Sequence, residues 1–336
     1  MGTPEPITLT TKSPSSHDPV DPYSVVADSL RSVEQRLLDC TRSKETEITE
    51  IASHLIRGGG KRIRPVVTLL TFKALQGRRE EDAVDIAAAM ELIHAATLLH
   101  DDIIDGAEFR RGKESAYKRY GLTRTLVTGD FLFIKAFEFA GKFDETVVQW
   151  TADACTSLTE GEILQGSFNR KRTVTAEDYL QIVERKTASL FQTGARLGAY
   201  IAGASPEHVE VAANFGLDIG IAFQMMDDVL DVVGRRDLLG KSTGMDLRDG
   251  NPSLPIVLSL LDGHQAVARV FQSREPSEDD IQRALDAMGN GTVIERARTF
   301  SRKYALKACG EIEKLPESVA REALKALGRL LTDRDR

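Results

Sequence analysis

Apolar side chains recur at helical spacing along most of this chain. From Tyr23 onward only six prolines occur in 314 residues, and the alternation of apolar and polar residues that marks a half-buried strand is almost absent. The pattern therefore predicts an all-α fold, and hydroxyl residues followed by acids, as at Thr175 and Ser277, mark helix starts. The expected helices span residues 24–41, 45–57, 64–76, 80–105, 123–141, 145–169, 176–203, 207–232, 254–262, 278–289, 292–312 and 317–333.

The first 22 residues differ from the rest in composition. They hold five of the eleven prolines, with Ser, Thr and Asp between them, which predicts a disordered N-terminal tail at 1–22 and a single domain at 23–336. No repeat of solenoid type is present in the chain.

Composition narrows the function classes. Apolar residues make up 41% of the chain, enough for a large core, and the net charge of −7 gives no general attraction to nucleic acid. Three cysteines (Cys40, Cys155, Cys309) without metal-type spacing indicate a reducing compartment. No uninterrupted apolar run approaches the ~20 residues that span a bilayer, and the N-terminus lacks a leader pattern, so we expect a cytoplasmic protein without a transmembrane segment.

Three carboxylates follow a stretch, 87–99, that is apolar on all sides and therefore typical of a core helix. Asp101, Asp102 and Asp105 fall at about 0°, 100° and 40° around a helix axis, so they project from one face of the helix. The same arrangement recurs 126 residues later, after the apolar segment 215–226, at Asp227, Asp228 and Asp231.

A lone motif of this kind would fit a solvated helix end equally well, but two of them, each on a buried helix, favour a shared chemical role. A buried carboxylate without a cation is costly, and carboxylate oxygens are the ligands that Mg²⁺ prefers. Because Mg²⁺ usually binds one or two carboxylates together with substrate phosphates, facing acidic helices predict a metal-bridged phosphate or diphosphate between them.

Cationic residues cluster near both acidic motifs. The segment 58–65, GGGKRIRP, has a glycine triplet and then three cations in four residues, which suits a polyanion. Alone it could equally be a linker, and it lacks the GK[ST] ending of a P-loop, which argues against a nucleoside-triphosphate site. His94 lies two helical turns before Asp101 on nearly the same line, although a lone histidine is more often a core residue.

Further polar residues lie at positions that suit a diphosphate site. The segment 110–113, RRGK, directly follows the first acidic motif, and Gln224 lies one turn before the second. Lys186 lies on a long apolar helix, where it could also simply extend its ammonium group to solvent. Lys241 lies in a glycine-bounded loop that is suited to closing over phosphate.

Taken together, these motifs resemble the trans-type polyprenyl diphosphate synthases. The resemblance runs from about residue 50 to about residue 260, and its specificity comes from the order of the motifs rather than from any one of them. The matching segments are GGGKRIRP, ELIHAATLLHDDIID, RRGK, GDFLF, EGEILQ, ERKTASLF, FQMMDDVLD and GKSTGMDL.

The resemblance implies a fold, a reaction and a set of site residues. The implied fold is a single orthogonal bundle of helices around a deep central cavity, usually in a homodimer. The implied reaction is Mg²⁺-dependent condensation of isopentenyl diphosphate with an allylic diphosphate, and a peripheral membrane contact for product release is a further expectation.

The six aspartates would bind three Mg²⁺ ions. The allylic diphosphate would bind Arg110, Lys186 and Lys241, isopentenyl diphosphate would bind Lys61, Arg64, His94 and Arg111, and Thr187 and Gln224 would face the developing cation.

Product length in this family depends on the residues four and five positions before the first aspartate. Here these residues are Thr97 and Ala96, about 6 to 7.5 Å below Asp101 by helix rise. Because both are small, and because two rather than four residues lie inside the DDxxD motif, we expect a long product of six or more isoprene units.

Alternatives remain. The chain departs from the family pattern in the predicted substrate loops, at Glu114, Ser115, Tyr117, Asn251 and Ser253. A short-chain synthase with a C15 to C20 product is the second choice. A terpene cyclase would not be expected to keep the second acidic motif together with GGGKRIRP, and a non-catalytic subunit of a heteromeric synthase would usually have lost an acidic motif.

Overall fold

The computed structural model describes residues 20–110, 113–234 and 243–332. Within these residues the protein is helical apart from one two-stranded antiparallel hairpin, so the predicted all-α class is confirmed. The N-terminal elements are α1 (Pro22–Val25), α2 (Ala27–Cys40), α3 (Thr46–Arg57), α4 (Ile63–Ala74), α5 (Glu80–Ile104), β1 (Phe109–Arg110), β2 (Lys113–Glu114), α6 (Ala116–Tyr120) and α7 (Leu122–Ala140). The others are α8 (Glu145–Phe168), α9 (Ala176–Val183), the π-helical turn η1 (Glu184–Ala188), α10 (Ser189–Ile201), α11 (Pro206–Val233), α13 (Met245–Asp249), α14 (Leu254–Leu261), α15 (Gln265–Gln272), α16 (Glu278–Gly289), α17 (Val293–Ile312) and α18 (Val319–Thr332).

The helix boundaries follow local capping chemistry. Thr175 forms a capping box with Asp178 at the start of α9, and the Ser277 hydroxyl accepts a hydrogen bond from the backbone N–H of Asp280 at the start of α16. At the end of the predicted tail, Asp21 caps α1 and Pro22 is its first, buried residue. Residues 1–19 of the predicted tail lie outside the described residues.

Two further differences from the sequence prediction concern continuity. The predicted helix 176–203 is interrupted by the π-helical turn η1, which separates α9 from α10. The hairpin and the short helices α6, α13 and α15 were not predicted, and each lies in a connection between long helices.

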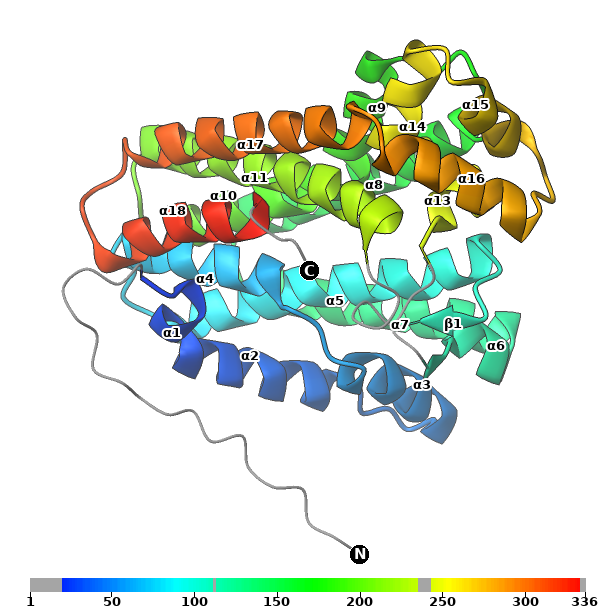
Figure 1. The fold of residues 1–336 in the computed structure, drawn as a ribbon. Coiled ribbons are helices and arrows are strands. Elements are labelled where there is room, and N and C mark those ends of the chain that lie inside the picture. The colour runs from blue at the N-terminus through cyan, green and yellow to red at the C-terminus, as the bar shows by residue number, and fades with distance from the viewer. Residues whose placement is uncertain (1–19, 111–112, 235–242, 333–336) are drawn as a thin grey trace, which may run out of the picture.

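Helix α5 lies in the middle of the bundle, between α2, α4, α7 and α10 (Figure 1). Every residue from Ala83 to Ile93 is buried, as expected for a helix that is apolar on all sides. It is the one described helix with the length and composition to cross a membrane, but 78% of its apolar window is buried inside the protein, which identifies it as a core helix.

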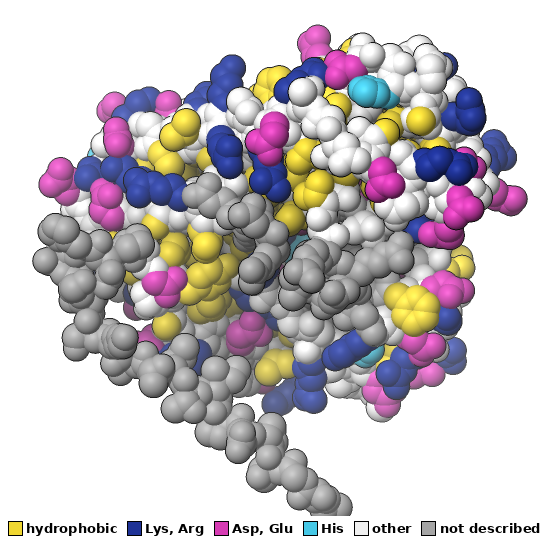
Figure 2. Space-filling view, viewed as in Figure 1, with side chains coloured by type: hydrophobic (Ala, Val, Ile, Leu, Met, Phe, Trp, Pro, Cys, Tyr) yellow, Lys and Arg dark blue, Asp and Glu magenta, His cyan; other side chains and the backbone are white. Residues whose placement is uncertain are grey.

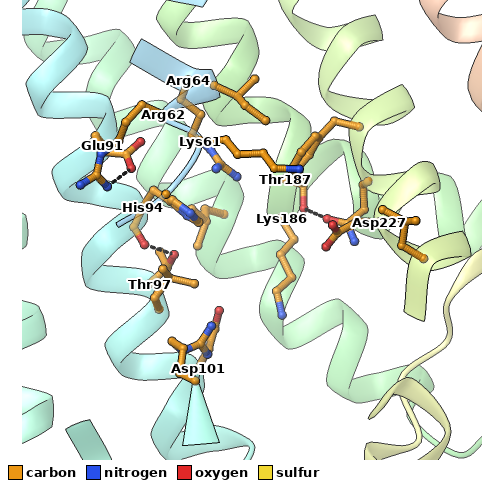
Figure 3. A pocket seen from close by; sticks show the side chains of 18 of the residues that line it. Lys61, Arg62, Arg64, Glu91, His94, Thr97, Asp101, Lys186, Thr187 and Asp227 are labelled. Carbon is orange, nitrogen blue, oxygen red and sulfur yellow. Dashed lines mark hydrogen bonds and ion pairs between the residues drawn. The ribbon is translucent and has the colours of Figure 1, made fainter. Parts of the chain in front are cut away.

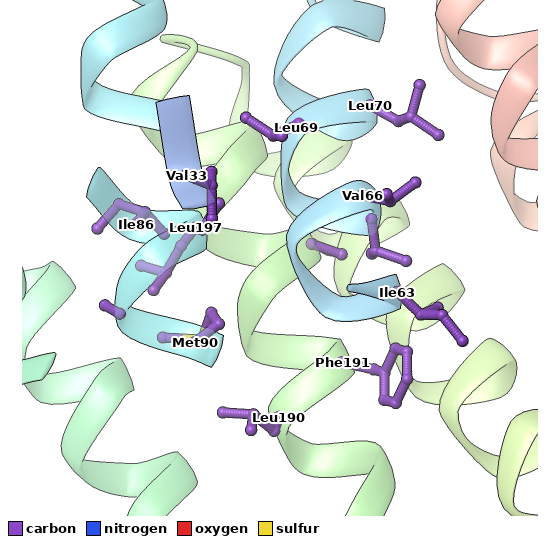
Figure 4. Close-up of a cluster of buried hydrophobic side chains, with 14 of the residues drawn as sticks. Val33, Ile63, Val66, Leu69, Leu70, Ile86, Met90, Leu190, Phe191 and Leu197 are labelled. Carbon is purple, nitrogen blue, oxygen red and sulfur yellow. The ribbon is translucent and has the colours of Figure 1, made fainter. Parts of the chain in front are cut away.

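The core consists of two clusters of buried apolar side chains, and α11 contributes to both. The larger cluster joins α2, α4, α5 and α10, where Val33, Leu69, Met90 and Leu197 are grouped (Figure 4). The smaller one is formed by the second half of α11 with α9, α14, α16 and α17. This packing fixes α11 relative to α5, and these two helices carry the two acidic motifs.

Candidate active site

The C-terminal parts of α5 and α11, the turn η1 and the loop before α4 border one cleft of about 510 Å³ (Figure 3). A second hollow of about 250 Å³ adjoins it and shares Asp101, Arg110 and Lys186 in its wall. Sequence reasoning therefore grouped residues that the fold brings together. The predicted residues in the wall of the larger cleft are Lys61, Arg64, His94, Thr97, Asp101, Arg110, Lys186, Thr187, Gln224, Asp227 and Asp231.

Six predicted residues are not in this wall. Ala96 is fully buried and is not among the residues that line the cleft, so its role in product length stays a prediction. Asp105 and Asp228 border the second hollow, and Asp102 borders neither of the two. Arg111 and Lys241 lie outside the described residues.

The three aspartates of the first motif have different environments. Asp102 is 1% exposed, and its Oδ1 accepts a hydrogen bond from Arg110 Nε at 2.6 Å, so this pair connects the hairpin to α5. Burial raises the pKa of Asp101 to about 6, an effect that the Lys186 ammonium partly opposes. Burial also raises the pKa of Asp105, again against the charge of Lys186. Asp101 and Asp105 are thus partly desolvated carboxylates that a further cation would stabilise.

The aspartates of the second motif also differ in their environments. Asp227 is exposed to the cleft, whereas Asp228 is buried and accepts hydrogen bonds from Tyr179 Oη at 2.7 Å, Gln224 Nε2 at 2.8 Å and Leu254 N at 2.9 Å. Burial raises the pKa of Asp228 to about 6 despite these donors.

Asp231, the last acid of that motif, accepts hydrogen bonds from the backbone N–H groups of Met245 and Asp246, at 3.1 and 3.2 Å. These groups belong to the first turn of α13, where N–H groups have no partner within the helix. Asp231 therefore attaches α13 to the end of α11 and also lines the cleft.

The π-helical turn η1 places Lys186 and Thr187 between the two motifs. Lys186 Nζ lies 2.5 Å from Glu162 Oε2 on α8, and the Thr187 hydroxyl donates to Gln224 Oε1 at 2.9 Å. Burial alone would lower the pKa of Lys186, but the nearby charges of Asp101 and Glu162 raise it overall, so the ammonium stays charged. A π-helical turn of this kind often occurs at functional sites.

Helix α8 approaches η1 closely because residue 161 is glycine. A Cβ atom at Gly161 would lie 2.5 Å from the backbone nitrogen of Lys186, closer than any real contact. The small residue therefore lets Glu162 reach Lys186.

The opposite end of the cleft is cationic. Lys61, Arg64 and His94 all line it, and Arg64 lies over the Phe191 ring with its guanidinium carbon 4.7 Å from the ring centroid (Figure 3). Burial lowers the pKa of Arg64 to about 10, while the charges of Glu91 and Asp227 oppose the change. The group remains cationic at neutral pH and could bind an anion without help from a metal.

Sequence reasoning gave no role to Glu162 and Tyr179, and it counted Arg62 among the cations that suit a polyanion, whereas the structure pairs Arg62 with Glu34 and Glu91. Glu162 lies within the EGEILQ motif and Arg62 lies between two predicted ligands, so each residue had a signal in its sequence position. Tyr179 had none, because its contact with Asp228 joins segments 49 residues apart.

The acidic residues fit a hard divalent cation only in combination with a ligand. Within the described residues, no three Asp, Glu, His or Cys side chains are grouped closely enough to hold a metal by themselves. Asp101, Asp105 and Asp227 nevertheless offer oxygen atoms to the two adjoining hollows, and magnesium sites of this kind are completed by phosphate oxygens and water.

Comparison with known proteins decides the family. The family model described as polyprenyl synthetase matches residues 45–288, most of the chain and both acidic motifs. This chain belongs to the polyprenyl synthetase family.

Individual members of the family are similar over nearly the whole chain. The octaprenyl diphosphate synthase of Escherichia coli is 32% identical over 316 residues, which are 93% of this chain and 98% of that protein. The geranylgeranyl pyrophosphate synthase of Geoglobus acetivorans is also 32% identical, over 319 residues, which are 93% of this chain and 98% of that protein. A polyprenyl synthase from Caulobacter crescentus, crystallised with calcium and isoprenyl diphosphate, superposes with a TM-score of 0.90 at 32% identity, covering 94% of this chain and 97% of that one.

This polyprenyl synthetase is therefore a prenyltransferase, and its fold is the all-α fold of the isoprenoid synthases. Its relatives make products of different lengths at equal identity, so identity alone does not assign the product.

Proposed function

We propose that this polyprenyl synthetase condenses isopentenyl diphosphate head-to-tail with an allylic diphosphate to form a long-chain all-trans polyprenyl diphosphate. The observation that carries the proposal is the division of one cleft into two ends. Asp101 and the Lys186 ammonium lie at one end, with Asp105 in the adjoining hollow, and Lys61, Arg64 and His94 lie at the other, with Asp227 across the cleft from His94. Two diphosphates can thus bind side by side, one next to Asp101 and Lys186 and the other next to Lys61, Arg64 and His94.

The reaction requires these two ends to act differently. Breaking the allylic C–O bond leaves a carbocation and releases diphosphate with the bonding electron pair, so charge stabilisation must be strongest for the departing group. Lys186 and Arg110, which both line the cleft, would bind that group. The double bond of isopentenyl diphosphate then attacks the cation, and loss of a proton restores an allylic diphosphate that is five carbons longer.

The polar atoms of Thr187 and Gln224 lie between the two ends. The Thr187 hydroxyl donates to the Gln224 amide oxygen, and the amide nitrogen donates to Asp228, so this chain of hydrogen bonds fixes both side chains. Their oxygen atoms would face the developing cation. The apolar wall residues Leu98, Leu158 and Phe223 exclude water, which would otherwise quench it.

Divalent metal is part of the proposal. Asp101, Asp105 and Asp227 would hold Mg²⁺, three ions by analogy with the family, and the ions would neutralise the departing diphosphate. Asp102, Asp228 and Asp231 were also predicted as metal ligands. Their carboxylates bind protein donors in this structure, which supports an indirect role in holding the site together.

The long product is supported by the small side chain at Thr97, which lines the cleft below Asp101. A short-chain C15 to C20 synthase is the alternative, favoured by the equal similarity to a geranylgeranyl pyrophosphate synthase.

A homodimer and a cytoplasmic location are further proposals. Leu122, Leu126 and Ile134 lie at multiples of four residues along α7 and are exposed, as is Ile163 on the adjacent helix α8. A stripe of this kind suits a second copy of the chain. The three cysteines are free thiols, as expected in a reducing compartment.

The test is product analysis. Purified protein would be incubated with Mg²⁺, isopentenyl diphosphate and C5, C10, C15 or C20 allylic diphosphates, and the products would be sized by chromatography and mass spectrometry. We expect products of C30 or longer, and no turnover in excess EDTA. Products that stop at C15 or C20 would establish the short-chain alternative, and no product with any primer would contradict prenyl transfer.

A further inference from the structure

Arg62 has a strained backbone at the entrance to α4. Its φ of 49° and ψ of 37° place it in the left-handed region, which long side chains rarely adopt. The residue lies between Lys61 and Arg64, both at the cationic end of the cleft. Such strain persists only where surrounding contacts fix the conformation, so the contacts of Arg62 are informative.

The guanidinium group of Arg62 joins three helices. Its Nε lies 2.5 Å from Glu34 Oε1 on α2, its Nη1 donates to Glu91 Oε1 on α5 at 2.8 Å, and its Nη2 donates to the Ile56 carbonyl of α3 at 3.0 Å. The side chains of Arg62 and Glu91 are each only 7% exposed. The five donors of a planar guanidinium suit three separate acceptors, which a lysine could not satisfy together.

These contacts tie the loop to the helix that carries the rest of the cationic end. Glu91 lies one helical turn before His94 on α5, so the Arg62–Glu91 pair fixes the loop relative to His94 (Figure 3). On the other side of the loop, the Tyr23 hydroxyl of α1 donates to the Lys61 carbonyl at 2.8 Å. The backbone just before Arg62 is thereby held, and α4 begins just after it.

We propose that Arg62, held by Glu34 and Glu91, is a positioning residue that sets Lys61 and Arg64 against His94 for binding a diphosphate without metal. The inference rests on the proposed function, because it assigns that diphosphate to isopentenyl diphosphate. A merely structural ion pair would affect stability and both substrates alike. A positioning residue affects the metal-free site and spares the metal-dependent one.

The chain offers a matched control. Arg36 Nε lies 2.9 Å from Asp85 Oδ1 and also joins α2 to α5, but Asp85 lies six residues before Glu91, about 9 Å away along the helix. Arg36→Met thus removes an ion pair between the same two helices without removing the link to the loop.

The experiment measures binding and kinetics separately. Isopentenyl diphosphate would be titrated in excess EDTA by calorimetry into the wild type, Arg62→Met, Arg62→Lys, Arg62→Met/Glu91→Gln and Arg36→Met. KM would then be measured for each substrate with Mg²⁺, alongside thermal melts. The double variant is included because Arg62→Met alone leaves the Glu91 carboxylate buried and uncompensated.

We expect Arg62→Met and the double variant to weaken metal-free binding, and to raise KM for isopentenyl diphosphate, by roughly 10-fold or more, since small misplacements of binding groups are costly. KM for the allylic substrate should change by less than about 2-fold, Arg62→Lys should be intermediate, and Arg36→Met should match the wild type.

Wild-type affinity in the double variant, or an equal loss for both substrates, would overturn the inference. If the wild type makes no product but binds isopentenyl diphosphate in EDTA, the proposed reaction fails and the binding series still decides the role of Arg62. If the wild type does not bind it in EDTA, the inference fails as well.

Discussion

Adjacent residues Asp227 and Asp228 show how one motif serves two purposes. The side chain of Asp227 faces the cleft, while Asp228 accepts three hydrogen bonds from α9, α11 and the start of α14. Each of these donors would lose its partner if the carboxylate were removed. Asp227 is therefore placed to meet a substrate, and Asp228 is placed to hold the end of α11.

This difference predicts two distinct phenotypes. Asp227→Asn should lower kcat by roughly 10²-fold or more with little change in melting temperature, because the charge that it removes is exposed to the cleft, where the diphosphate would bind. Asp228→Asn should cost about 1–3 kcal/mol of folding free energy, because an amide nitrogen would replace a buried acceptor. Steady-state kinetics and thermal melts of both variants check the prediction. Near-normal turnover of Asp227→Asn at ordinary Mg²⁺ would show that this carboxylate is structural.

The grouping of the aspartates was predictable from the sequence because it depends only on helical spacing. Their division into cleft-facing and hydrogen-bonded residues was not, because it depends on Arg110 and Tyr179, which approach from other elements. Buried polar atoms must find partners, but the sequence does not say which segment supplies them.

At the scale of elements, the long helices were predictable and the short ones were not. Apolar periodicity extends over many turns in α5, α8 and α11, whereas a helix of five residues such as α13 is stabilised mainly by tertiary contacts. The π-helical turn η1 was missed because the apolar pattern runs on from α9 into α10 without a break. Yet α13 and η1 both contribute side chains or N–H groups to the site.

The contact between α8 and η1 can be tested at one glycine. Gly161→Ala should push η1 away, displace Lys186 and lower kcat by roughly 10-fold or more, because the added Cβ meets backbone that cannot rotate aside. Gly166→Ala on the same helix is the control, since its Cβ would meet nothing within 4 Å and alanine favours helix. It should keep full activity with unchanged or slightly higher stability. A Gly161→Ala protein with wild-type kcat and KM would mean that the close approach is not needed.

Positions 96 and 97 on α5 make a second test at this scale. Thr97 lines the cleft, so Thr97→Phe should shorten the products toward C15–C20 while the first condensation keeps much of its rate. Ala96 is fully buried, so Ala96→Phe should overpack the core, cost about 1–3 kcal/mol and reduce all products together. Product sizing beside thermal melts separates the two effects. Shorter products from Ala96→Phe at an unchanged melting temperature would place Ala96 in the wall of the cavity that holds the growing product.

At the scale of the whole molecule, the site depends on segments that the sequence keeps far apart. The cleft joins the loop at Lys61 to Asp231 and Thr243, and only the resemblance to a known family indicated that these segments meet. Surface charge carries no such information. Acidic and basic side chains are interspersed over the face seen in Figure 2, in keeping with a protein that has no general affinity for polyanions.

The proposed homodimer makes a prediction for the entire molecule. Ile134 is 60% exposed and is the last residue of the stripe on α7, and a charge there would have to be buried without a partner if a second copy covered it. Ile134→Glu should therefore shift sedimentation from dimer to monomer. Leu306→Glu on α17, where the leucine is 72% exposed, is the control and should stay dimeric, because an isolated exposed leucine is normal on a monomer surface. A wild type that sediments as a monomer would refute the proposal directly, and an Ile134→Glu variant that remains dimeric would place the interface on another face.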